Sequence, residues 1–260
     1  MKDSHVDEFI ALTKCTRQMA REFLEKNNYE LDYALNDFYD TCQNGFVVDM
    51  RPMAPELIAL FEKYRSSEID SSISTDGLVQ LIEDLGLELE DPVTLCLAHT
   101  LQVKSLHDPI SRNQFLDGLH SAFCASLEDV KSMLIEKESK LRNDADYLET
   151  IYNYTYGLIL EPDHKTLHLK AAQEYWNLYF DPPTNTKFAI QPSKPFFKQW
   201  KAFLESQGTT TISRDVWQMF FKFIKQYPTL QALKQDYNEM DAWPLLIDEF
   251  YEYLEENGAL

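Results

Sequence analysis

Apolar residues recur at three- and four-residue intervals along most of this chain, which is the spacing of an amphipathic helix. Convincing alternation of apolar and polar residues, which would predict strands, is absent. We therefore predict an all-α fold. In the larger part of the chain the expected helices cover residues 55–65, 76–86, 92–102, 112–123, 126–141, 146–160, 169–180, 194–205, 214–227, 229–237 and 241–257.

The first part of the chain carries a separate, shorter helical pattern. Residues 6–41 fit three helices, and the second of them is expected to begin after Thr16 as its N-cap. The stretch QNGFVVDMRPMAP contains a glycine and two prolines and has no period, so it is interpreted as a linker. We predict a three-helix module over 1–45, a linker over 46–54 and a helical domain over 55–260. The apolar residues that share one face in the second and third helices of the module are Met19, Ala20, Phe23, Leu24, Leu31, Ala34, Leu35 and Phe38.

Three segments of the larger domain share an internal pattern. In SSISTDGLVQLI, DPISRNQFLDGL and TTISRDVWQMFF, an Ile-Ser pair stands one or two residues before an amphipathic helix. This resembles the second half of an EF-hand, in which the Ile of one loop forms a small bridge with a paired loop. Calcium would require a Glu four residues after the Ile, but those positions hold Gly77, Gln114 and Val216. We predict EF-hand-like helix-loop-helix units that do not bind calcium.

Composition and charge narrow the class of protein. The apolar fraction of 44% with 13% aromatic residues is sufficient for a packed core, and only 7 glycines suit a helical chain. A net charge of -19 repels phosphate backbones, which disfavours nucleic acid as a partner. No apolar run is long enough to span a bilayer, and the first residues do not resemble a signal peptide. We expect a soluble protein of the cytoplasm and nucleus that binds neither nucleic acid nor membranes.

Residues that could carry chemistry form no recognised catalytic motif. The 4 cysteines are far apart without a CxxC pair, which indicates reduced thiols and not a disulfide framework or a zinc site. His164 and His168 are four residues apart, but EPDHKTLHLK predicts a loop entering a helix, so we interpret this spacing as coincidence. Cys96 and His99 would share a helix face, but the helix is apolar. We therefore interpret them as a buried Cys and a hydrogen-bonded His and not as a catalytic pair. We predict no metal site and no cofactor.

The N-terminal module resembles a ubiquitin-associated (UBA) domain. The resemblance rests on TRQMAREFLEKNNYELDYALNDFYD, a helix, an Asn-Asn turn and a final Leu-x-x-Ala-Leu helix. UBA domains bind ubiquitin through an apolar loop and the end of the last helix. The loop positions here hold Thr13, Lys14 and Cys15, while Phe38 and Tyr39 stand at the end of the last helix. The resemblance implies a ubiquitin-type contact at Phe38 and Tyr39, and a purely structural three-helix module is the alternative.

The chain as a whole resembles the defective-in-cullin-neddylation family, near its fungal members. The distinctive segments are TLCLAH, EYWNLYF, TTISRDVW and AWPLLIDEF, which follow the UBA-like module and the linker. The resemblance implies a monomeric scaffold-type ligase that binds a cullin's C-terminal winged-helix region and the neddylation conjugating enzyme together. Such a scaffold accelerates transfer of the modifier by proximity and requires no catalytic side chain.

An acidic cullin-binding patch follows from the same resemblance. It maps to Asp215 in SRDVW and to Ala242 and Asp248 in DAWPLLID. From the residues alone, Asp215 is expected in the first turn of a helix after Ser213, where a carboxylate complements the helix dipole. The C-terminal residues 236–260 contain many acids and no Lys or Arg, which favours a basic partner.

The family also has an apolar pocket for the N-acetylated Met of the conjugating enzyme. Acetylation removes a terminal charge that would be costly to bury. The resemblance implies that the pocket is lined by Leu78, Leu97, Ala98, Leu101, Ile110, Leu158, Tyr175 and Leu178.

Two alternatives to a scaffold-type ligase remain open on the sequence. One is a ubiquitin-binding adaptor whose helical domain has no role in transfer. The other is an enzyme that uses Cys96 or Cys124 as a thioester nucleophile.

Overall fold

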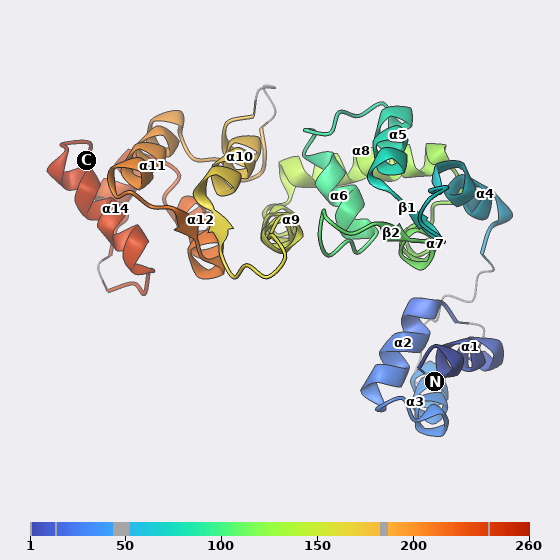
Figure 1. The fold of residues 1–260 in the computed structure, drawn as a ribbon. Coiled ribbons are helices and arrows are strands. Elements are labelled where there is room, and N and C mark those ends of the chain that lie inside the picture. Colours follow the sequence, from blue (N-terminus) through green and yellow to red (C-terminus); the bar gives the residue numbers. More distant parts are fainter. Residues whose placement is uncertain (1, 14, 44–52, 183–186, 239) are drawn as a thin grey trace. The chain divides into compact units, whose positions relative to one another are not determined.

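Helices dominate the protein. The structure is a computed structural model that describes residues 2–13, 15–43, 53–182, 187–238 and 240–260. Within these ranges the strands are short segments of two residues each, and the predicted all-α fold is confirmed (Figure 1). None of the helices in the described ranges combines the length and the apolar character needed to cross a membrane.

The three N-terminal helices form where the apolar pattern predicted them. Thr16 is the N-cap of the second helix, because its side-chain oxygen accepts a hydrogen bond from the Met19 backbone N–H at 3.3 Å. The rings of Phe9, Phe23 and Phe38 meet in the core of the module, with Phe38 edge-on to both of the others. These helices are α1 (Lys2–Thr13), α2 (Arg17–Lys26) and α3 (Leu31–Gln43).

A first pair of helix-loop-helix units follows. Their loops join through two short antiparallel strands, in which Ile73 lies opposite Ile110. This is the bridge that the Ile-Ser pattern predicted. The elements are α4 (Pro55–Tyr64), β1 (Ser72–Ile73), α5 (Thr75–Leu85), α6 (Val93–Thr100), β2 (Ile110–Ser111) and α7 (Arg112–Ser121), and α8 (Leu127–Asn143) comes next.

Two positions at which an EF-hand would carry a calcium-binding Glu have other roles here. Gly77 on α5 lies so close to α4 that a Cβ atom would be 2.3 Å from the backbone oxygen of Tyr64. Gln114 completes a capping box at the start of α7, where it and Ser111 bond each other's backbone N–H groups. Close helix packing and capping therefore account for both residues.

A second pair of units repeats this arrangement in the C-terminal half. The strands β3 and β4 pair antiparallel, with Leu167 opposite Ile212 and His168 opposite Thr211. The Ile-Ser pattern predicted the bridge of Ile212 but not its partner, because β3 carries Leu-His in place of Ile-Ser. The elements of this half are α9 (Ala145–Leu158), β3 (Leu167–His168), α10 (Leu169–Phe180), α11 (Lys194–Ser206), β4 (Thr211–Ile212), α12 (Arg214–Gln226), α13 (Leu230–Asp236) and α14 (Leu245–Glu256).

The core of this half is built from stacked aromatic rings. Trp217 on α12 stacks on Tyr152 of α9 at 4.5 Å and on Trp176 of α10 at 5.4 Å, and all three are fully buried. The Trp217 indole N–H donates to the Tyr152 backbone oxygen at 3.0 Å, and the Tyr152 hydroxyl donates to the Trp217 backbone oxygen at 2.9 Å. The Trp176 indole N–H donates to the Tyr152 hydroxyl at 2.7 Å. Stacking and hydrogen bonds thus join three helices around one tyrosine.

The chain forms two compact units, each with its own core. The first unit comprises Met1–Leu85, Thr100–Gln102 and Pro109–Met133, and the second comprises Gly86–His99, Val103–Asp108 and Leu134–Leu260. The predicted linker 46–54 lies mostly outside the described residues. The second unit contains α9 to α14 and therefore all three residues of the predicted acidic patch.

Candidate functional site

Asp215 stands at the start of α12, directly after the β4 bridge. The Ser213 side chain caps this helix by accepting a hydrogen bond from the Val216 backbone N–H at 3.2 Å. Asp215 lies in the first helical turn, as predicted, and its side chain is exposed. A carboxylate there complements the partial positive charge of the helix N-terminus. The short strand, the cap and the helix dipole together hold an acidic group at the surface.

Asp248 lies in the first turn of α14 and is held by a tyrosine from outside that helix. The helix begins directly after Pro244, four residues later than the start of the predicted range of 241–257. The Tyr237 hydroxyl donates a hydrogen bond to the Asp248 carboxylate at 2.8 Å. The Tyr237 ring in turn stacks on Tyr251 of the same helix, with the ring centroids 3.8 Å apart. Asp248 is half-buried, and the hydrogen bond from Tyr237 gives its carboxylate a defined orientation.

The protonation of Tyr237 supports this arrangement. Burial, and then the hydrogen bond to the Asp248 carboxylate, raise the pKa of Tyr237 well above its ordinary value. A raised pKa keeps the hydroxyl protonated, and therefore able to donate, throughout the physiological pH range. The sequence analysis did not identify Tyr237, because this hydrogen bond spans 11 residues and forms only when the two segments pack together.

Ala242 is exposed on the segment that connects α13 to α14. The next residue, Trp243, packs edge-on against Phe223 of α12 at 5.1 Å. On the other side, the Asp241 carboxylate accepts hydrogen bonds from Gln226 at 3.3 Å and from Asn238 at 3.1 Å. The small methyl group of Ala242 is thus presented by a segment that is fixed on both sides.

The helix α12 carries Asp215 and packs against residues next to the other two predicted patch residues. The ring of Phe223, in the last part of α12, contacts Trp243 at 5.1 Å and Tyr237 at 6.5 Å, which places the surroundings of Ala242 and Asp248 at that end. Asp215 lies on the first turn of the same helix, about 12 Å earlier along its axis. Asp215 therefore lies near one end of α12, and the residues that flank Ala242 and hold Asp248 pack near the other end.

The helices α12 and α14 carry five acidic residues that we call the acidic surface: Asp215, Asp248, Glu252, Glu255 and Glu256. Their carboxylates are not neutralised by neighbouring bases. Within the described ranges, none of the five forms an ion pair with a Lys or Arg side chain. Unpaired carboxylates of one sign produce a negative potential that attracts cationic groups. The arrangement suits a basic protein surface with at least two cationic contacts.

The predicted apolar lining divides between the two units. Leu78, Leu101 and Ile110 belong to the first unit; Leu97, Ala98, Leu158, Tyr175 and Leu178 belong to the second. Four of them are buried, namely Leu97, Leu101, Ile110 and Leu158. Leu78, Ala98, Tyr175 and Leu178 are half-buried, so they have apolar surface that a ligand could still cover.

Within the second unit, α9 connects α6 to α10. The Tyr154 hydroxyl donates to the backbone oxygen of Val103, just after α6, at 2.6 Å. The hydroxyls of Thr155 and Tyr179 share a hydrogen bond of 2.8 Å between α9 and α10. His99 of α6 lies edge-on to Tyr154 at 4.9 Å, and burial lowers the pKa of His99, which favours its neutral form.

The two cysteines considered as nucleophiles are both inside the protein. Cys96 has no exposed surface and Cys124 is 3% exposed. Burial raises the pKa of Cys96 to about 11, so its thiol is protonated at neutral pH. A thioester nucleophile requires an accessible thiolate, and neither site provides one.

The ubiquitin-type contact predicted on the N-terminal module needs a correction. Phe38 is 2% exposed and packs against Phe9 and Phe23, so its ring belongs to the core. Tyr39 is 47% exposed, and its hydroxyl donates to the backbone oxygen of Leu12 at 3.3 Å. Leu12 is itself exposed, and the sequence analysis did not identify it. Tyr39 and Leu12 therefore lie on the surface of the module, whereas Phe38 lies in its core and contacts the Tyr39 ring.

Two family models match the chain. One, described as cullin binding, matches residues 129–253, and the other, described as a UBA-like domain, matches residues 3–45. The first range contains all three predicted patch residues, and the second confirms the UBA-like character of the N-terminal module.

Relatives that align with nearly the whole chain are found in fungi. The chain is 37% identical over 257 residues to "Defective in cullin neddylation protein 1" of Saccharomyces cerevisiae, covering 96% of this chain and 93% of that protein. It is 40% identical over 263 residues to the protein of the same name in Candida glabrata, covering 97% and 96%. "DCN1-like protein 3" of Drosophila melanogaster is 29% identical over 205 residues, covering 78% of this chain and 57% of that protein.

Proposed function

This chain belongs to the defective-in-cullin-neddylation family, and from that membership we propose that it acts in cullin neddylation as a scaffold and not as a catalyst. It binds the C-terminal region of a cullin and the neddylation conjugating enzyme together. The observation that carries the proposal is the acidic surface, whose carboxylates form no ion pair with a Lys or Arg among the described residues. Asp215, Asp248 and Glu252 of this surface lie within the range of the cullin-binding model.

The cullin contact is electrostatic and oriented. Asp215 on α12 and Asp248 on α14 each accept a Lys or Arg side chain, and the exposed methyl of Ala242 leaves space for the partner to approach. Hydrogen bonds to charged groups are roughly twice as strong as neutral ones. The hydrogen bond from Tyr237 fixes the Asp248 carboxylate before the cullin arrives. Such preorganisation lowers the entropy cost of binding.

The conjugating enzyme binds through its acetylated first Met. Half-buried Ala98, Tyr175 and Leu178 of the second unit supply apolar surface for the Met side chain. Burying a charged amino terminus in such surroundings is costly, whereas an acetyl amide requires only hydrogen bonds. The acetyl group therefore selects the processed form of the enzyme.

Acceleration then arises from proximity. A scaffold that holds both proteins converts a bimolecular transfer into an effectively unimolecular one, which can lower the barrier by several kcal/mol. The reactive thioester belongs to the conjugating enzyme and the acceptor lysine to the cullin. The burial of Cys96 and Cys124 is consistent with a protein that contributes no nucleophile of its own.

A reconstituted transfer assay tests this function. It contains a cullin C-terminal fragment, the charged conjugating enzyme in acetylated or unacetylated form, and this protein. We expect the protein to accelerate modification of the cullin, and to do so about tenfold more weakly with the unacetylated enzyme, which corresponds to about 1.4 kcal/mol. Equal rates with and without this protein would refute the scaffold function; equal rates with both enzyme forms would refute only the assigned pocket.

Removing the Tyr237 hydroxyl tests the orientation of Asp248. In Tyr237→Phe the ring stays in its stack on Tyr251, but the carboxylate loses its donor. We expect affinity for the cullin fragment, measured by calorimetry, to fall roughly fivefold, or about 1 kcal/mol. Tyr253→Phe, which removes a hydroxyl further along α14, is the matched control and should bind normally. Wild-type affinity in Tyr237→Phe would show that this hydrogen bond does not position the carboxylate.

Exposed apolar residues favour a second function for the N-terminal module. Tyr39 and Leu12 adjoin through a hydrogen bond, and Tyr33 is 69% exposed nearby in sequence. Such a surface suits weak binding of ubiquitin or a ubiquitin-like modifier. Titrating each modifier into the labelled protein and recording amide shifts tests this contact. Shifts that persist in the double variant Leu12→Ser, Tyr39→Ser would place the contact elsewhere, and none in the wild type would leave the module a structural one.

A further inference from the structure

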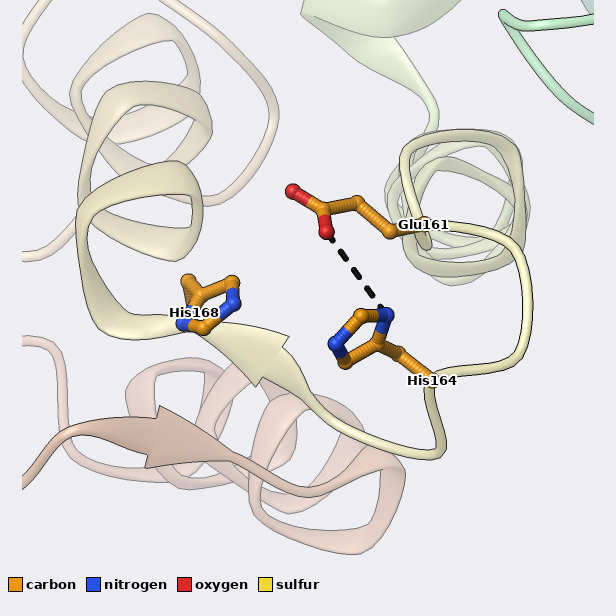
Figure 2. Close-up of side chains that lie close together, drawn as sticks. All are labelled: Glu161, His164 and His168. Carbon is orange, nitrogen blue, oxygen red and sulfur yellow. Dashed lines mark ion pairs between the residues drawn. The ribbon is translucent and has the colours of Figure 1, made fainter.

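The loop between α9 and α10 brings three metal-ligating side chains together. Glu161 follows the end of α9, His164 lies in the loop, and His168 is the second residue of β3. Their potential ligand atoms all lie within 4.8 Å of one another. Figure 2 shows the Glu161 carboxylate facing the His164 imidazole, with His168 beside them at the start of α10. The two imidazole centroids are 5.6 Å apart.

The backbone holds these residues in place on both sides of the loop. His168 pairs with Thr211 across the β3–β4 bridge, and the next backbone N–H, that of Leu169, donates to the Thr210 oxygen at 2.9 Å. At the other end, the His164 backbone N–H donates to the Glu161 oxygen at 3.1 Å and closes a tight turn. This turn requires Asp163 to adopt a positive φ of 65°.

The His164 ring is also oriented. Its Nδ1 atom lies 3.1 Å from the backbone oxygen of Pro162 and 3.6 Å from the Glu161 carboxylate. A proton on Nδ1 that is donated to this carbonyl leaves Nε2 with a free lone pair. Imidazoles that bind metal ions commonly use one ring nitrogen for the metal and donate the other N–H to a carbonyl.

We propose that Glu161, His164 and His168 form a binding site for Zn²⁺. Two imidazoles and one carboxylate suit zinc and neighbouring first-row metals, whereas calcium and magnesium prefer oxygen ligands. Zinc–ligand bonds of about 2.0–2.2 Å place tetrahedral ligand atoms about 3.3 Å apart. Side chains within 4.8 Å reach that geometry by small torsional shifts, since all three are exposed. Water completes the coordination.

The expected consequence is a clamp on one helix-loop-helix unit. The ion joins the end of α9 to the start of α10, across the loop in which an EF-hand would hold calcium. A ligand that binds only the folded form stabilises it by mass action. Zinc should therefore raise the melting temperature of the second unit and protect the backbone of residues 161–168 from hydrogen exchange.

Calorimetric titration of Zn²⁺ into the full, tag-free and reduced chain tests the site. We expect one ion to bind with high affinity, and binding to weaken at least about tenfold in His164→Ala and in His168→Ala. Glu161→Gln should also weaken it. His107→Ala is the matched control, because His107 is an exposed histidine of the same unit and should leave the affinity unchanged. Calcium in place of zinc should produce no binding heat at this site.

Thermal unfolding with and without Zn²⁺ supplies an independent measurement. The wild type and His107→Ala should show a zinc-dependent rise in melting temperature, and His164→Ala and His168→Ala should show none while folding normally without metal. Retained high-affinity binding in both of these variants would overturn the proposal by placing the ion elsewhere. The absence of zinc binding in the wild type would overturn it as well.

Discussion

The double variant Asp215→Arg, Asp248→Arg is expected to lose binding to the cullin C-terminal fragment and stimulation of its modification. Each reversal replaces an attractive contact by repulsion between like charges. A combined cost of about 3 kcal/mol or more corresponds to an affinity loss of at least about 100-fold. Calorimetry measures the affinity, and the reconstituted transfer assay measures the stimulation.

A matched control distinguishes the loss of this specific contact from the effect of changing the net charge of the protein. Glu90→Arg with Glu205→Arg changes the net charge equally at two exposed acids of the second unit. This control should weaken binding only slightly, and more at low salt than at high salt, because distant charges are screened. Both double variants should retain wild-type helical content. Equal losses in both, or normal cullin binding in Asp215→Arg, Asp248→Arg, would contradict the assigned contact.

The largest loss of stability is expected from Trp217→Ala. This substitution removes the ring that stacks on Tyr152 and Trp176, and also the indole N–H that donates to the Tyr152 backbone oxygen. Truncation of a fully buried Trp costs about 3–5 kcal/mol. We expect the free energy of unfolding of the second unit to fall by that amount, measured by urea denaturation followed by circular dichroism.

A second substitution at Trp217 separates the contribution of the aromatic ring from that of the indole hydrogen bond, and a substitution at an exposed leucine serves as the control. Trp217→Phe keeps an aromatic ring but leaves the Tyr152 carbonyl without its donor, so we expect a smaller loss of about 1–3 kcal/mol. Leu245→Ala is the control, because Leu245 is 72% exposed and its truncation should change stability by less than about 0.5 kcal/mol. If Trp217→Ala lost no more stability than Leu245→Ala, the aromatic stack would not be the main source of stability in this unit.

Local features of the sequence predicted most of the secondary structure. Helical periodicity located the helices to within a few residues, since apolar residues on one face must be buried wherever the helix packs. Thr16 and Ser213 cap their helices as expected, because a cap depends only on the next few residues. The Ile-Ser pattern predicted the pairing of β1 with β2, but it did not identify β3, whose Leu167 occupies the same place without that pattern.

Family resemblance predicted the acidic patch, and the helical pattern correctly placed Asp215 at the start of a helix. The sequence did not indicate that Tyr237 orients Asp248, because the two residues meet only when α13 and α14 pack around the end of α12. Nor did it decide between Phe38 and Tyr39 on the N-terminal module. Adjacent residues on a helix point in different directions, and only packing shows which one is buried.

The sequence by itself determined the all-α class, the approximate positions of the helices and several of their caps, because each of these depends on interactions between residues close together along the chain. The tertiary structure alone decided which side chains from different segments meet. The four-residue spacing of His164 and His168 was interpreted as coincidence, because the stretch predicts a loop entering a helix. The turn at Asp163 and the β3–β4 bridge fold this loop back, so that the two imidazoles and Glu161 converge. The turn is local, but the β3–β4 bridge joins segments that are far apart in the sequence, and no local pattern predicted that pairing.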